Sequence, residues 1–177
     1  MNTLRTTAHA RQTLILALDV DTLDKAKYFL NTLYPRITLF KIGLQLFTAH
    51  GPSIIKIIRK KRAEVFLDLK FYDIPHTVAN AVRQAVRLRV KMLTLHIEGG
   101  REMLQAAVQA RDQEAARQGI KKPLLVGVTV LTSKKATPQE VLRLAKIGMN
   151  CGLDGVVCSA QEAAVLRKRI KQSFLIV

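Results

Sequence analysis

Short apolar runs alternate with amphipathic segments along nearly the whole chain, and this alternation limits the possible folds more than any other feature. The apolar runs have strand length: Leu14–Leu18, Ile37–Phe40, Val65–Leu69, Lys91–Leu95, Leu124–Val130, Gly155–Val157 and Phe174–Val177. The segments between them carry apolar residues near 3.6-residue spacing: Leu23–Leu33, Pro52–Lys61, Val78–Arg89, Arg101–Gln118, Pro138–Cys151 and Ala160–Lys171. Strands and helices alternating at this interval predict βαβ units and a parallel sheet.

Size and composition favour one globular domain. The chain has 177 residues, of which 49% are hydrophobic and 24% charged, which is ordinary for a domain with a substantial core. We find no linker or low-complexity tract, so we expect residues 1–177 to form a single barrel domain with a flexible tail over residues 1–12. No run approaches the roughly 18 apolar residues of a membrane span, and the first residues lack the apolar region of a secretory signal.

Polar side chains recur where the predicted strands end. They are Asp19, Lys41, Asp68, Lys70, His96, Thr132, Ser133 and Ser159. Both (β/α)8 barrels and doubly wound sheets place their sites at the carboxyl ends of parallel strands. No G-x-G-x-x-G motif follows the first strand, which disfavours a dinucleotide-binding sheet. A TIM (β/α)8 barrel is therefore the favoured α/β fold.

One stretch, V-F-L-D-L-K-F-Y-D-I-P-H-T from Val65 to Thr77, concentrates charge at such a strand end. Asp68 and Lys70 are two residues apart, so a regular strand would direct both side chains to one face. Asp73 follows, and Pro75 suits the first turn of a helix. Because buried charges must be paired, this cluster is either a structural ion network or an active site.

The stretch D-L-K-F-Y-D-I-P-H-T resembles the signature of the orotidine 5'-phosphate decarboxylase family. Four other segments agree with that family in the same order: A-L-D-V, K-I-G-L-Q-L-F-T-A-H-G-P, V-T-V-L-T-S and G-L-D-G-V-V-C-S-A-Q-E-A. The resemblance implies a TIM barrel that converts orotidine 5'-monophosphate to UMP in pyrimidine biosynthesis, without a metal or cofactor. A related phosphosugar decarboxylase is an alternative, and the last segment argues against it.

The resemblance also implies roles for individual residues. Lys70 would protonate the C6 carbanion, Asp68 would face the substrate carboxylate, and Lys41 would pair with Asp68 and contact the ribose. Asp73 would reach into the neighbouring subunit's site, which implies a homodimer, although Asp73 could instead cap the following helix. The remaining expected contacts are Asp19 and Thr77 with the ribose hydroxyls, and Thr132 and Ser133 with the pyrimidine edge.

The C-terminal end carries a further expectation. The chain stops at Val177 within an apolar run, and we find no eighth βα unit, whereas a (β/α)8 barrel takes at least about 200 residues. The resembled family continues with a T-P-G-I-R segment and a Gly-Arg pair that grip the substrate phosphate, and this sequence has neither. We therefore expect an incomplete barrel with impaired turnover, from a truncated or partial chain.

The charge leaves a second class of function open. Twenty-nine Lys and Arg residues against 13 Asp and Glu residues give a net charge of +16, which can signal a polyanion partner. The positive residues are scattered over predicted helices, so solvated helix faces with only non-specific nucleic-acid binding are the simpler interpretation. Cys151 and Cys158 fit neither a zinc motif nor a disulfide framework, and we expect reduced thiols in a cytoplasmic protein.

Overall fold

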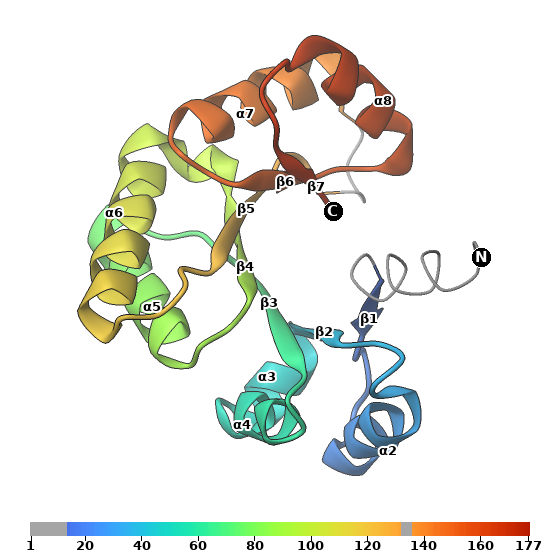
Figure 1. Cartoon of the computed structure of the whole chain (residues 1–177). Helices are drawn as coiled ribbons and strands as arrows, with labels where there is room; N and C mark the ends of the chain where they lie inside the picture. The colour runs from blue at the N-terminus through green and yellow to red at the C-terminus, as the bar shows by residue number, and fades with distance from the viewer. Residues whose placement is uncertain (1–13, 132–135) are drawn as a thin grey trace, which may run out of the picture. The chain divides into compact units, whose positions relative to one another are not determined.

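The computed structural model describes residues 14–131 and 136–177. These residues form two compact units whose boundary falls between Leu69 and Lys70, and each unit is described by itself. The strands follow one another in the order β1 to β7, and the pairs inside each unit are parallel (Figure 1). Each unit is thus built from successive strand–helix repeats.

The first unit contains three parallel strands. Its elements are β1 (Ile15–Ala17), α2 (Leu23–Leu33), β2 (Leu39–Gly43), α3 (Leu44–His50), α4 (Ser53–Lys60) and the start of β3 (Glu64–Phe71). In the sheet register Ala17 lies opposite Lys41, and Gly43 lies opposite Asp68. The pairing therefore brings the ends of β1, β2 and β3 to the same edge, which is the edge that carries the predicted site residues.

Local sequence explains how the helices of this unit begin and what they bury. Thr22 precedes α2 and its side chain accepts a hydrogen bond from the backbone N–H of Lys25, which satisfies one of the free donors of the first turn. Helix α4 buries Ile54, Ile55 and Ile58, which lie at the helical spacing that the sequence predicted. The apolar pattern of the sequence did not predict α3, because this short helix buries only Leu46.

The second unit contains the remaining repeats. Its elements are α5 (Pro75–Arg87), β4 (Met92–His96), the 3-10 turn η1 (Ile97–Gly99), α6 (Gly100–Gln118), β5 (Leu124–Val128), α7 (Pro138–Asn150), β6 (Gly155–Val157), α8 (Ala160–Arg169) and β7 (Leu175–Ile176). Helices α5 and α6 lie side by side in Figure 1 and pack against each other. Both helices bury apolar side chains, among them Val82 and Val86 of α5 and Leu104 and Ala107 of α6.

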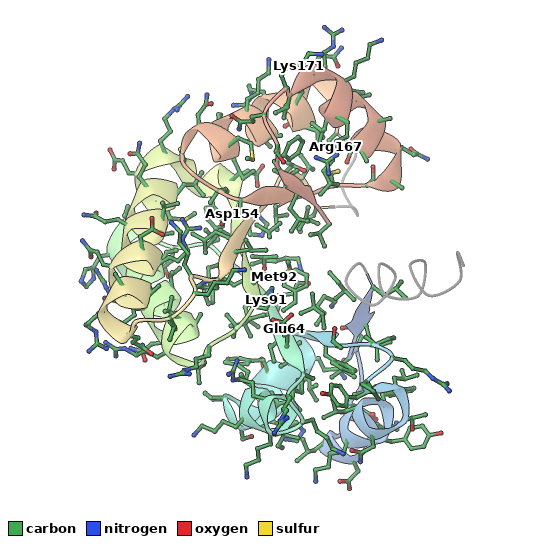
Figure 2. All side chains as sticks on the ribbon, in the orientation of Figure 1. Glu64, Lys91, Met92, Asp154, Arg167 and Lys171 are labelled. Carbon is green, nitrogen blue, oxygen red and sulfur yellow. The ribbon has the colours of Figure 1, made fainter. Side chains whose placement is uncertain are left out.

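Two arginines tie helices of this unit to its strands. Arg111 on α6 is 3% exposed, and its Nη1 lies 2.5 Å from Asp154 Oδ2, which also accepts the backbone N–H of Leu125 at 2.8 Å. Arg167 on α8 is labelled in Figure 2. Its guanidinium carbon lies 4.6 Å from the centre of the Phe174 ring. A buried charge must be paired to be tolerated, so the Arg111–Asp154 pair fixes α6 against β5 and β6.

The predicted fold class is confirmed. The described residues give an α/β fold with strands β1 to β7 and no eighth strand, as in a TIM (β/α)8 barrel without its last βα unit. The predicted single domain remains a prediction, and the predicted tail, residues 1–12, lies outside the described residues. Within the described part of the chain, no helix is both long and apolar enough to cross a bilayer.

Candidate active site

Three charged side chains meet at the strand ends of the first unit. Lys41 of β2 places its Nζ 3.0 Å from Asp19 Oδ1 and 3.6 Å from Asp68 Oδ2. The side chains of Lys41, Asp19 and Asp68 are 20%, 64% and 12% exposed. The ammonium therefore lies between two carboxylates, one largely solvated and one largely buried. The expected pairing of Lys41 with Asp68 matches this geometry.

Gly43, two residues after Lys41 on β2, has no side chain that would fill the space beside these charges. A β-carbon built at Gly43 would lie 3.4 Å from Asp19 Oδ1 and 3.6 Å from Lys41 Nζ. A methyl group would fit in ordinary contact, but a longer side chain would compete with a ligand for the surroundings of the ammonium. Glycine at position 43 thus leaves room for a ligand beside Asp19 and Lys41.

Lys70 begins the second unit with an uncommon backbone conformation. Its φ angle is +50°, which is in the left-handed region that residues with a β-carbon rarely adopt. Its backbone N–H donates a hydrogen bond of 2.8 Å to Oγ1 of Thr94 on β4. The sequence predicted that the side chains of Asp68 and Lys70 lie on one face of a regular strand. Because the backbone at Lys70 is left-handed, the two-residue spacing alone does not establish this.

Two predicted site residues, Asp73 just before α5 and Thr77 in its first turn, are exposed. Asp73 Oδ1 accepts the backbone N–H of Ile74 at 2.7 Å, and Ile74, not Asp73, is the residue at the N-cap position before Pro75. Asp73 thus binds the backbone just before the helix without being its cap. Thr77 lies exposed in the first turn of α5. The side chains of Asp73 and Thr77 are therefore accessible to solvent or to a ligand at the N-terminal end of α5.

Other predicted strand-end residues fall into two groups. Thr132 and Ser133 lie outside the described residues. Ser159 is the N-cap of α8, and its backbone N–H donates to Glu162 Oε2 at 2.8 Å, which is a structural capping arrangement. The sequence did not predict a role for Thr94, which the structure places against Lys70. The available signal was a single hydroxyl inside the apolar run Lys91–Leu95.

The residues that these contacts bring together form two groups, each within one unit. Lys41 with Asp19 and Asp68 belongs to the first unit, and Lys70 with Thr94 belongs to the second. Along the chain, Leu69 alone separates Asp68 from Lys70. Among the described residues, no group of three His, Cys, Asp or Glu side chains could hold a metal ion. The chemistry that these groups offer is that of fixed positive and negative charges and a proton-bearing ammonium.

Comparison with known proteins identifies the class to which this arrangement belongs. The model of the orotidine 5'-phosphate decarboxylase / HUMPS family matches residues 12–177. The orotidine 5'-phosphate decarboxylase of Coxiella burnetii is 44% identical over 174 residues, which cover 92% of this chain and 72% of the relative. The enzyme of the same name from Moorella thermoacetica is 40% identical over 181 residues, covering 96% of this chain and 72% of the relative.

Two solved structures have a fold similar to that of this chain. The crystal structure of orotidine 5'-phosphate decarboxylase from Lactobacillus acidophilus matches with a TM-score of 0.84 and 32% identity, covering 92% of this chain and 78% of that one. An uncharacterized conserved protein from Geobacillus kaustophilus matches with a TM-score of 0.84 and 34% identity, covering 92% and 80%. This chain belongs to the orotidine 5'-phosphate decarboxylase / HUMPS family of decarboxylases. The resemblance noted in the sequence is thereby confirmed.

Proposed function

We propose that this chain decarboxylates orotidine 5'-monophosphate to UMP in pyrimidine biosynthesis, without a metal or cofactor, and that Lys70 supplies the proton. The observation that carries the proposal is the paired Lys41 between Asp19 and Asp68, in a member of a decarboxylase family. The substrate is taken from the printed names of relatives that are 40% and 44% identical.

The proposed reaction breaks one bond and makes one. The bond from C6 of the pyrimidine to its carboxylate breaks, CO2 leaves, and the electron pair stays on C6. The Lys70 ammonium then transfers a proton to C6, and the neutral amine regains a proton from water. A preorganised positive charge near developing negative charge is usually the largest single contribution to catalysis, so Lys70 would act before the proton moves as well as during its transfer.

Asp68 would act on the substrate carboxylate. Two like charges about 4 Å apart repel by about 4 kcal/mol at an effective dielectric constant of about 20. This repulsion falls as CO2 departs, so it favours the transition state over the bound substrate. The ion pair with Lys41, at 3.6 Å, would hold the Asp68 carboxylate in place.

The other residues would bind the rest of the substrate. Lys41, Asp19 and Thr77 would contact the ribose, and Thr132 and Ser133 would contact the pyrimidine edge. Asp73 would complete the site of a neighbouring subunit, so we propose a homodimer in the cytoplasm. The exposed position of Asp73 just before α5 is compatible with a contact to a second chain.

An absorbance assay tests this proposal. The chain is incubated with orotidine 5'-monophosphate, loss of the orotate absorbance is followed, and UMP is identified by mass spectrometry. The Coxiella burnetii relative serves as the reference, so the same assay tests the expected impairment of turnover. Conversion of substrate to UMP supports the proposal. No conversion by a folded chain at enzyme concentrations near that of the substrate would refute it.

A second candidate function is binding of polyanions, and one surface feature favours it. A hollow of about 320 Å3 in the second unit is lined by Lys146, Met149, Asn150, Arg169, Ile170, Lys171 and Gln172. Three of these seven residues are cationic, and the whole chain carries a net charge of +16. Phosphate groups are attracted to such surfaces in a salt-dependent way.

A nucleic-acid column separates this function from a general charge effect. Retention at about 200 mM salt that is lost in a Lys146→Glu, Lys171→Glu double variant would support a polyanion site at the hollow. A Lys25→Glu, Lys60→Glu double variant, with the same change of charge on α2 and α4 of the first unit, is the control. Release of the unmodified chain below that salt concentration would show that the net positive charge attracts nucleic acid only non-specifically, which would refute a polyanion-binding function.

A further inference from the structure

We propose that Thr94 is a positioning residue for Lys70: its hydroxyl holds the Lys70 backbone N–H and so keeps the lysine in the left-handed conformation from which its side chain starts. This inference rests on the proposed role of Lys70 in decarboxylation. It adds a residue that does not touch the reacting atoms and acts only through Lys70.

The backbone of Lys70 is in an unfavourable conformation. Its φ angle of +50° brings the β-carbon close to neighbouring backbone atoms, which disfavours this conformation for every residue except glycine. A left-handed lysine persists only where surrounding contacts hold it, and such residues cluster at functional sites. The hydrogen bond of 2.8 Å from Lys70 N to Thr94 Oγ1 is a contact of this kind.

The side chain of Thr94 is buried. It is 1% exposed and lies on β4 between Leu93 and Leu95, both 0% exposed. Placing a hydroxyl in such surroundings is unfavourable unless the group is hydrogen-bonded, and an alanine or valine would satisfy β4 as well. The branched side chain of threonine has few rotamers, so the buried strand fixes the direction in which the hydroxyl points.

The contact between Thr94 and Lys70 affects catalysis through the lysine side chain. A lysine side chain has a long flexible stem, so the direction of its Cα–Cβ bond decides which region the ammonium can reach. The left-handed conformation sets that direction, and Thr94 stabilises the conformation. Displacing a catalytic group by about 1 Å can cost about 100-fold in rate, so loss of the anchor should lower turnover more than substrate binding.

Two substitutions that differ in whether they keep the hydroxyl test the inference. Thr94→Val keeps the shape of the side chain and removes the hydroxyl, whereas Thr94→Ser keeps the hydroxyl and is the matched control. We expect kcat of the valine variant to fall at least about tenfold, with KM within about twofold of the unmodified chain and kcat of the serine variant within about threefold of it. Equal kcat for the valine variant and the unmodified chain would overturn the inference.

A second measurement does not require turnover. Hydrogen exchange of the Lys70 amide, followed by NMR, should be slow in the unmodified chain and at least about tenfold faster in the valine variant, which corresponds to about 1.4 kcal/mol for the lost bond. A Lys70 amide that exchanges in the unmodified chain at the rate of an unstructured peptide would overturn the inference even if the valine variant does not fold. An unmodified chain with a protected Lys70 amide but no decarboxylation would instead refute the proposed function.

Discussion

Lys41 pairs with two carboxylates at the strand ends of the first unit. Its ammonium contacts Asp19 at 3.0 Å and Asp68 at 3.6 Å. Asp19 is 64% exposed, so water screens it and its pairing contributes little to stability. Asp68 is 12% exposed, so its charge depends more on protein partners. The ion pair with Asp68 should therefore contribute more to the stability of the fold than the ion pair with Asp19.

This difference predicts an unequal response to substitution. Asp19→Asn should lower the free energy of unfolding by less than about 1 kcal/mol, because an exposed ion pair is weak. Lys41→Met should lower it by about 1–3 kcal/mol, because it removes the cationic ion-pair partner of the mostly buried Asp68. Urea unfolding at pH 7 measures both. A larger loss for Asp19→Asn than for Lys41→Met would contradict this account of the ion pairs.

Cys158 is predicted to be an unreactive thiol. Burial raises its pKa above the ordinary value of 9.0, and the nearby Glu162 carboxylate raises it further. Since only the thiolate reacts, alkylation by iodoacetamide at pH 8 should be slower in the folded chain than in urea. Mass spectrometry of the labelled peptide measures the two rates. Equal rates for folded and unfolded chain would show that the protein environment does not protect this thiol.

Helices α5 and α6 are joined by a network that centres on one carboxylate. Glu114 is 4% exposed and accepts hydrogen bonds from Arg117 Nη2 at 2.6 Å, Gln118 Nε2 at 2.8 Å and Arg87 Nε at 2.9 Å. Arg117 and Gln118 belong to α6, and Arg87 is the last residue of α5. These donors, Arg117 first and then Arg87, hold the pKa of Glu114 far below its ordinary value of 4.5.

The depressed pKa predicts a defined pH dependence. A carboxyl whose pKa is lower in the folded state stabilises that state above its unfolded pKa, and the contribution is lost as pH falls toward the folded pKa. Glu114→Gln should therefore be less stable than the unmodified chain by a constant amount above about pH 5, and the gap should narrow below pH 4.5. Urea unfolding between pH 7 and pH 3 measures this gap.

The exposed Glu102 in the first turn of the same helix supplies the control. Glu102→Gln should show a smaller loss of stability at pH 7, because Glu102 has no comparable set of donors among the described hydrogen bonds. A Glu114→Gln variant whose deficit stays constant down to pH 3 would contradict the proposed role of this carboxylate.

At the scale of elements, periodicity predicted most of the fold. Segments with a clear apolar stripe, such as α4 and α5, lie within a few residues of their predicted bounds. Helix α3 was missed because a helix of seven residues with one buried side chain leaves no periodic signal. The left-handed Lys70 could not be predicted either, since nothing local favours that conformation and its anchor, Thr94, lies 24 positions away.

At the scale of the whole molecule, the family and the fold class were predictable, and the arrangement of the site was only partly so. The motif around Asp68 and Lys70 indicated the family, and the family match over residues 12–177 confirms it. The pairing of Lys41 with Asp68 follows from the register of β2 and β3. Its second partner, Asp19, was expected only as a ribose contact, because spacing along the sequence carries no information on side-chain reach.

The most direct test of the central claim is the effect of Lys70→Ala on kcat/KM for orotidine 5'-monophosphate. Lys168→Ala on the exposed surface of α8 removes the same charge as a control. We predict that kcat/KM falls at least about 1,000-fold in Lys70→Ala, because both charge stabilisation and proton transfer are lost, and stays at the unmodified level in Lys168→Ala. A Lys70→Ala variant that keeps turnover within tenfold of the unmodified chain would contradict the account.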